Sequence, residues 1–147
     1  MARLTRSVLA HVAAVLAPCA VLAPCAVLWG CGDVEVRDPS NGPVVISTVP
    51  ADGELDVDAS LPALSVTFSE AMLREGWSWV TELRHAAPEV TGAAYYVDDV
   101  TNVLPVSLLP ATSYVVWVNS PDDEHLRKFA STHGVAAPAY RIRFTTR

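Results

Sequence analysis

The sequence has little of what a nucleic-acid-binding protein or a disordered chain requires. Only 10 of its 147 residues are Lys or Arg, against 16 Asp or Glu, and the formal net charge is −6. Proteins bind phosphate backbones through clusters of basic residues, so we expect no nucleic acid among the partners. Charged residues make up 18% of the chain and hydrophobic residues 51%, a composition that excludes intrinsic disorder over its length.

Catalytic motifs are missing as well. No Gly-x-Ser-x-Gly or Ser-x-x-Lys sequence is present to activate a serine nucleophile, and the seven glycines form no phosphate-binding loop. The histidines beyond residue 31 are His85, His125 and His133, and their spacing does not suit a shared metal ion. We therefore expect a protein that is not an enzyme and that needs no cofactor.

Acidic residues are absent from the N-terminal segment, which has the features of a secretory signal. Arg3 and Arg6 give it a basic start, and an apolar run follows over residues 8–29. Because Pro18 and Pro24 would interrupt a membrane-spanning helix, we favour a cleaved signal, with an uncleaved anchor as an alternative. Residues 32–147 then carry all 16 acidic residues against eight basic ones.

Cysteine occurs at three positions, the last of which is Cys31. The segment Leu28-Trp29-Gly30-Cys31 resembles the lipobox of bacterial lipoproteins, in which an aliphatic and a small residue precede the cysteine that receives lipid. The resemblance implies that residues 1–30 are a lipoprotein signal peptide and that Cys31 is acylated, with plain secretion as an alternative. The mature chain then has no other cysteine, so its fold depends on a hydrophobic core rather than a disulfide.

The remainder divides into a tether and one domain. Residues 31–42 comprise the expected lipidated cysteine and a polar segment rich in turn-forming residues. Residues 43–147 have the length of a single domain, and their apolar residues recur with the period of two that is typical of β-strands. The expected strands cover 44–49, 64–69, 77–83, 93–97, 103–108, 113–118 and 140–145. About seven short strands separated by turns predict an all-β fold, an antiparallel β-sandwich.

One segment departs from the strand pattern and predicts a short helix over 121–132. Ser120 is suited to cap it and Pro121 to occupy its first position, followed by three acidic residues in the first turn. Gly134 is suited to end it.

Three motifs resemble the bacterial Ig-like domain of the S-layer-protein (SbsA) type. They are Val49-Pro50-Ala51-Asp52-Gly53, Val66-Thr67-Phe68-Ser69-Glu70-Ala71-Met72, and Leu108-Leu109-Pro110-Ala111-Thr112-Ser113-Tyr114, with Phe144-Thr145-Thr146 near the end. The resemblance implies an Ig-like sandwich over residues 43–147 that acts as a spacer or an interaction domain. The third motif also fits a tyrosine corner, in which a core tyrosine bonds upstream backbone through its hydroxyl. We expect Phe68 and Tyr114 in the core.

Two groups of residues are candidates for binding. Trp77 and Trp79 lie on one face of an expected strand, where paired indoles form a sugar-stacking platform if exposed and fill the core if buried. The loop residues Asp52, Glu54, Asp56 and Asp58 are a weak candidate for calcium, because calcium prefers carboxylate oxygens. Their order does not match an EF-hand, and a loop of solvated acidic residues is the alternative.

These features favour a non-enzymatic, lipid-anchored Ig-like module of the bacterial cell envelope that faces the periplasm or the cell exterior. Its expected partners are the membrane, through the lipid, and an envelope protein or a glycan. The alternative is a glycan- or peptide-binding surface lipoprotein that uses Trp77 and Trp79 or an open sheet edge.

Overall fold

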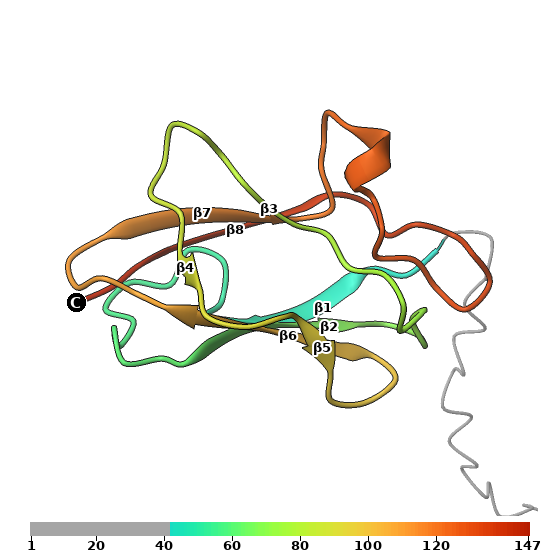
Figure 1. Ribbon diagram of the computed structural model, residues 1–147, viewed down its shortest axis with the longest axis horizontal. Coiled ribbons are helices and arrows are strands. Elements are labelled where there is room, and N and C mark those ends of the chain that lie inside the picture. The colour runs from blue at the N-terminus through green and yellow to red at the C-terminus, as the bar shows by residue number, and fades with distance from the viewer. Residues whose placement is uncertain (1–41) are drawn as a thin grey trace, which may run out of the picture. The chain divides into compact units, whose positions relative to one another are not determined.

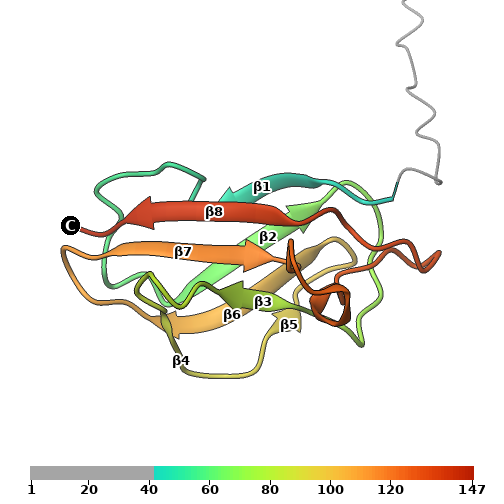
Figure 2. The same ribbon diagram turned by 90° about the horizontal axis from the view of Figure 1, so that it is seen from above.

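The chain folds into two antiparallel β-sheets that pack face to face (Figures 1 and 2). The computed structural model describes residues 42–147, so the expected signal peptide, Cys31 and the start of the tether lie outside the described residues. The first sheet contains β1 (Val45–Val49), β2 (Ala63–Phe68), β4 (Glu89–Val90), β5 (Tyr95–Tyr96) and β6 (Thr101–Ser107). The second contains β3 (Trp79–Thr81), β7 (Ser113–Val118) and β8 (Tyr140–Thr145). The predicted all-β antiparallel sandwich is confirmed.

The strand order explains the sequence patterns. The first sheet has the order β1-β2-β6-β4, with β5 also paired to β6, and the second has the order β3-β7-β8. In β2 and β6 every second residue is buried, because one face of each strand meets the core. The central strand β7 is buried at four of its six positions, which accounts for its apolar residues on both faces. Within residues 42–147, no helix is long and apolar enough to cross a membrane.

Aromatic side chains fill the space between the sheets. Phe68 and Tyr114 are each 1% exposed, as expected. The ring centroid of Phe68 lies 5.2 Å from that of Phe129, and the rings of Tyr114 and Phe144 stack at 5.2 Å. Val116 stands two residues after Tyr114, fully buried in this core. The fold is therefore held by packing at a position where antibody domains have a disulfide cysteine.

The predicted tyrosine corner forms at the start of β7. The backbone N–H of Leu109 donates to the Tyr114 hydroxyl oxygen at 2.7 Å, across five residues of chain. The hydroxyl of Thr146 donates to the carbonyl of Leu109 at 2.6 Å, so both backbone groups of Leu109 are bonded.

Tyr114→Phe is expected to lower the free energy of unfolding by about 1–2 kcal/mol, because the Leu109 N–H then loses its acceptor while the ring stays packed. Urea unfolding of residues 32–147, expressed without the leader, measures the change. Tyr140→Phe is the control, since it removes a hydroxyl from a half-buried tyrosine outside the corner. Equal stability of Tyr114→Phe and the unmodified chain would show that the corner contributes nothing.

The predicted helix over 121–132 is wrong, because only a three-residue 3₁₀ turn, η2 (Glu124–Leu126), forms there. Its beginning is as expected: the Ser120 hydroxyl oxygen accepts the N–H groups of Asp122 and Asp123 at 3.2 and 3.0 Å. The helix does not continue because the Asn119 side chain accepts the N–H of Phe129 at 2.9 Å and holds its ring in the core. Local helix signals are thus overridden by a tertiary hydrogen bond.

Candidate functional site

The candidate site is built around β3, the edge strand of the three-stranded sheet. Its three residues pair with β7 in the register Trp79–Val118, Val80–Trp117 and Thr81–Val116. The short chain Trp77–Thr81 crosses one side of the sandwich opposite β4 and the segment that follows it. β3 has three residues and β4 has two, so each sheet ends in a short strand on this side.

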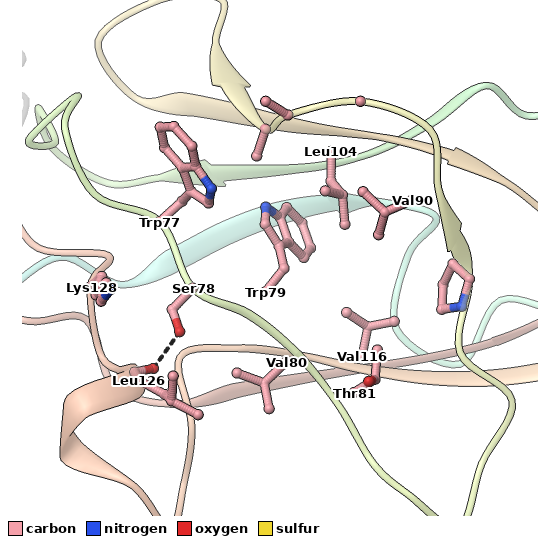
Figure 3. A pocket seen from close by; sticks show the side chains of 14 residues that line it. Trp77, Ser78, Trp79, Val80, Thr81, Val90, Leu104, Val116, Leu126 and Lys128 are labelled. Atoms are coloured by element: carbon pink, nitrogen blue, oxygen red, sulfur yellow. Dashed lines mark hydrogen bonds between the residues drawn. The ribbon is translucent and has the colours of Figure 1, made fainter.

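The structure separates the roles of the two tryptophans (Figure 3). Trp77 precedes β3 and is 39% exposed, whereas Trp79 is half-buried. The indole N–H of Trp79 donates to the Asn102 side-chain oxygen at 2.9 Å, and its ring meets Phe129 edge-on at 5.9 Å. A platform of two exposed indoles is therefore not present, because the core and a buried amide hold the second ring.

A pocket of about 540 Å³ opens beside these rings. Leu104 of β6 and Val116 of β7 are core residues that line its inner part. Three large apolar side chains that line it are exposed: Trp77 at 39%, Val90 at 59% and Leu126 at 40%. The volume lies within the range of about 300–1,000 Å³ that is typical of ligand sites.

Polar groups in the pocket are sparse. The Ser78 hydroxyl donates to the carbonyl oxygen of Leu126 at 2.5 Å and ties η2 to the start of β3 (Figure 3). Of the described residues that line the pocket, Lys128 alone carries a charge. The pocket thus offers mainly apolar contacts, with Ser78, Thr81 and Lys128 as its polar side chains.

A buried amide behind Trp79 was missed in the sequence. Asn102 is fully buried on β6, and its side-chain nitrogen has no hydrogen-bond partner within residues 42–147. Nearby on β5, burial raises the pKa of Tyr96 to about 12. The available signal was an asparagine at an inward position of a strand whose other inward residues, Leu104 and Val106, are apolar.

The acidic loop serves the edge of β8. The Asp52 carboxylate accepts the N–H of Arg143 at 2.9 Å, and the Glu54 carboxylate accepts the N–H of Ala51 at 2.8 Å. Asp58 accepts the Ser60 N–H and hydroxyl and also binds Arg147. These hydrogen bonds lower the pKa of Asp58 to about 2, the bonds from Ser60 being the largest cause.

The same loop continues the backbone pairing of β8. Gly53 and Val57 donate to the carbonyls of Arg143 and Thr145, and Thr145 donates to the carbonyl of Glu54. Within residues 42–147, no group of three or more His, Cys, Asp or Glu side chains is placed to hold a metal ion. The structure therefore does not bring the calcium candidates Asp52, Glu54, Asp56 and Asp58 together as a metal site, because their loop is stretched along an edge that it protects.

The three histidines lie on the surface in different segments. His85, His125 and His133 are all exposed. His85 contacts the carboxylate of Glu82 at 3.0 Å, and the other oxygen of that carboxylate accepts the indole N–H of Trp117 at 2.6 Å. The bond from Trp117 is the largest cause of the lowered pKa of Glu82. This arrangement links His85, Glu82 and Trp117 on the outer face of the second sheet.

The two-sheet architecture and the tyrosine corner agree with a comparison of the sequence with known families. Residues 39–146 match the family described as Bacterial Ig-like domain. The chain belongs to the bacterial Ig-like domain family. The sandwich of β1–β8 is the architecture of this Ig-like domain, and the Ig-like fold expected from the three sequence motifs is confirmed.

Solved structures similar to this Ig-like domain include two of one surface-layer protein. They are the crystal structure of the S-layer protein rSbsC(31-844), at 14% identity, and the structure of surface layer protein SbsC, domains 1–6, at 15%. Each similarity covers 71% of this chain and 14% of that chain, with a TM-score of 0.38. No curated protein matches the chain.

Proposed function

We propose that this protein is a non-enzymatic module of the bacterial cell envelope, anchored to a membrane by lipid on Cys31, that acts as a spacer and carries an interaction surface. The module faces the periplasm or the cell exterior. Its partners are the membrane and a second component of the envelope. Membership of the bacterial Ig-like family supports the module, and the Leu28-Trp29-Gly30-Cys31 motif supports the anchor.

The observation that carries the spacer role is the position of the two ends of the domain. The described chain enters the sandwich just before β1, at one end of the strands, and its C-terminus lies at the opposite end (Figures 1 and 2). Gly42 is buried against Val135, with a φ of +67°. If the domain is tethered just before β1, the opposite end of the sandwich lies one strand length away from the tether.

A non-enzymatic role is supported by what surrounds the polar side chains. The carboxylates of Asp52, Glu54 and Asp58 bond backbone or neighbouring side chains, and the pocket is lined mainly by apolar groups. An active site needs a nucleophile, acid or base placed beside a cavity, and none of these three carboxylates lines the pocket beside β3.

A second candidate function is recognition of a glycan or a peptide. The pocket beside β3, with Trp77 exposed at its rim, is the specific observation in its favour. This function is compatible with the first, since a spacer that carries a pocket is an interaction module.

Cys31→Ser is expected to move the protein from the detergent phase to the aqueous phase in Triton X-114 partitioning of bacterial cells. Without the thiol there is no site for the diacylglycerol, and the described domain has no membrane-spanning helix to replace it. Cys25→Ser is the matched control, because it removes a leader cysteine outside the motif and leaves partitioning unchanged. Detergent partitioning of Cys31→Ser with an unprocessed leader would contradict lipid anchoring and support an uncleaved anchor.

A further inference from the structure

The sandwich has edge strands that differ in how well they are protected. The loop 52–58 hydrogen-bonds along β8. A bulge between Val45 and Ser47 interrupts the pairing of β1, and such irregularities make an edge a poor template for another strand. At the opposite side of that sheet, β4 and β5 have two residues each. This leaves β3, whose edge is regular and lies beside the pocket.

The hydrogen-bond pattern of β3 shows which of its backbone groups are free. The N–H of Asn119 donates to the carbonyl of Ser78 at 2.9 Å, and this pair continues the register in which Val80 faces Trp117. In an antiparallel ladder, bonded and non-bonded pairs alternate. Ser78 and Val80 therefore direct their backbone groups toward β7, and Trp79 and Thr81 direct theirs away from it.

These outward groups have no partner within residues 42–147. No hydrogen bond joins the backbone N–H or C=O of Trp79 or Thr81 to another described residue, and β3 is the last strand of its sheet. The side chains of Trp79 and Thr81 lie on the same face of the sheet as those of their partners Val118 and Val116, which are buried, although Thr81 itself is exposed at the end of β3. An added strand would therefore direct every second side chain toward the pocket floor.

We propose that the β3 edge binds an extended peptide, which adds a fourth strand to the β3-β7-β8 sheet and inserts an apolar side chain into the pocket. The proposal rests on the proposed role as an interaction module and names its partner as a segment with apolar residues at alternate positions. Backbone bonds to Trp79 and Thr81 fix the strand, and the pocket beside Val90 and Leu104 selects the inserted side chain.

A peptide fits this surface better than a glycan does. The indole N–H of Trp79 is already bonded to Asn102, so Trp77 is the one exposed indole beside the pocket to stack on a sugar ring. The free groups are backbone donors and acceptors spaced two residues apart along a strand. The backbone of an added strand has the same spacing, so an extended peptide can pair with these groups through main-chain hydrogen bonds.

The test uses the full chain in lipid nanodiscs and a fluorescein-labelled peptide, Lys-Thr-Val-Thr-Val-Thr-Val-Lys, with binding followed by fluorescence anisotropy. Two N-methylated versions carry the methyl groups on alternate residues, in opposite phases. In a strand, one phase blocks the N–H groups that face β3 and the other blocks N–H groups that face solvent. We expect one version to bind at least tenfold more weakly and the other within about twofold of the parent, on the scale of lost hydrogen bonds.

Two pairs of variants locate the site. Thr81→Pro removes an outward N–H, which an edge strand tolerates, and is expected to weaken binding about tenfold. Thr81→Ala keeps the N–H and is the matched comparison, expected to weaken binding less than Thr81→Pro does. Val90→Asp places a charge at the pocket and is expected to weaken binding about tenfold or more. Its control is Val97→Asp, because Val97 is similarly exposed, at 57%, but does not line the pocket.

Equal effects of the two N-methylation phases, or normal binding by Thr81→Pro with an unchanged unfolding midpoint, would overturn the proposal. So would binding of chitotetraose without binding of the peptide, because a glycan site would then occupy the pocket. The anchoring is tested separately by Cys31→Ser. If the unmodified protein does not bind the peptide but Cys31→Ser shifts to the aqueous phase, only the β3 site is contradicted. If the peptide binds as expected but Cys31→Ser does not shift, only the anchor is contradicted.

Discussion

Phe68→Ala is expected to lower the free energy of unfolding of the domain by about 3–5 kcal/mol, the range typical of a large aromatic removed from a packed core. Phe68 is 1% exposed on the inner face of β2, and its ring lies 5.2 Å from that of Phe129. Phe129 in turn contacts Trp79 at 5.9 Å. The cavity would therefore open where the two sheets and the 120–138 segment meet, and local collapse cannot fill it without moving all three.

Urea unfolding of residues 32–147, expressed without the leader, measures this change. Ile46→Ala is the control, because Ile46 is 61% exposed on β1 and ordinary surface substitutions change stability by about 0.5 kcal/mol or less. A domain at the lower limit of the typical stability of about 5–15 kcal/mol would keep only about 0–2 kcal/mol after Phe68→Ala. Similar midpoints for Phe68→Ala and Ile46→Ala would contradict the position of Phe68 in the core.

The parts of the fold that the sequence predicted are those where local pattern and tertiary environment agree. In 113–118 and 140–145 the predicted and observed strand bounds coincide, because alternation or continuous apolarity there corresponds directly to burial. Tyr114 was also predicted correctly, since a corner requires a few residues of nearby chain. The two-residue strand β4 was not predicted, because Glu89 and Val90 are both exposed and carry no alternation.

The rest depended on contacts between residues far apart in the chain. The cluster from Asp52 to Asp58 was readable as a loop of carboxylates, but its role depends on β8, which lies alongside it and supplies Arg143, 91 residues after Asp52. Trp77 and Trp79 were expected on one face of a strand over 77–83, but β3 begins only at Trp79. The partial burial of Trp79 follows from Asn102 and Phe129, which lie far along the chain. The free edge of β3 likewise follows from its register with β7 and has no local signal.

Asn119 is the residue that most clearly escaped the sequence patterns, and Asn119→Ala is expected to destabilise the domain by about 3 kcal/mol or more. Its fully buried side chain donates to the carbonyls of Phe129 and Ala137 at 3.0 and 2.8 Å and accepts the N–H of Phe129 at 2.9 Å. The Phe129 carbonyl still accepts the N–H of Ala137 at 2.8 Å in the alanine variant. The Phe129 N–H and the Ala137 carbonyl lose their Asn119 partner, at about 1–3 kcal/mol for each that water does not reach.

The backbone of Asn119 adds a second, separable effect. Its φ is +60°, a left-handed conformation that asparagine and glycine adopt more readily than alanine. Asn119→Gly is therefore expected to be about 1 kcal/mol more stable than Asn119→Ala, although both lose the same hydrogen bonds. The difference between the two urea midpoints, with unchanged denaturant dependence, measures the backbone effect. Equal stabilities would show that this φ carries no cost in the domain.

Asn119→Gly also connects the core to the β3 pocket. The Asn119 side chain holds Phe129 through a hydrogen bond to its N–H. The segment just before Phe129 contributes Leu126 and Lys128 to the pocket lining. We expect this variant, under conditions in which it remains folded, to bind the alternating Thr-Val peptide more weakly, because one wall of the pocket loses its attachment to the core. Thr132→Ala, an exposed change farther along the same segment, serves as the control and binds normally. Unchanged peptide binding by folded Asn119→Gly would show that Ser78 and its bond to Leu126 suffice to hold that wall.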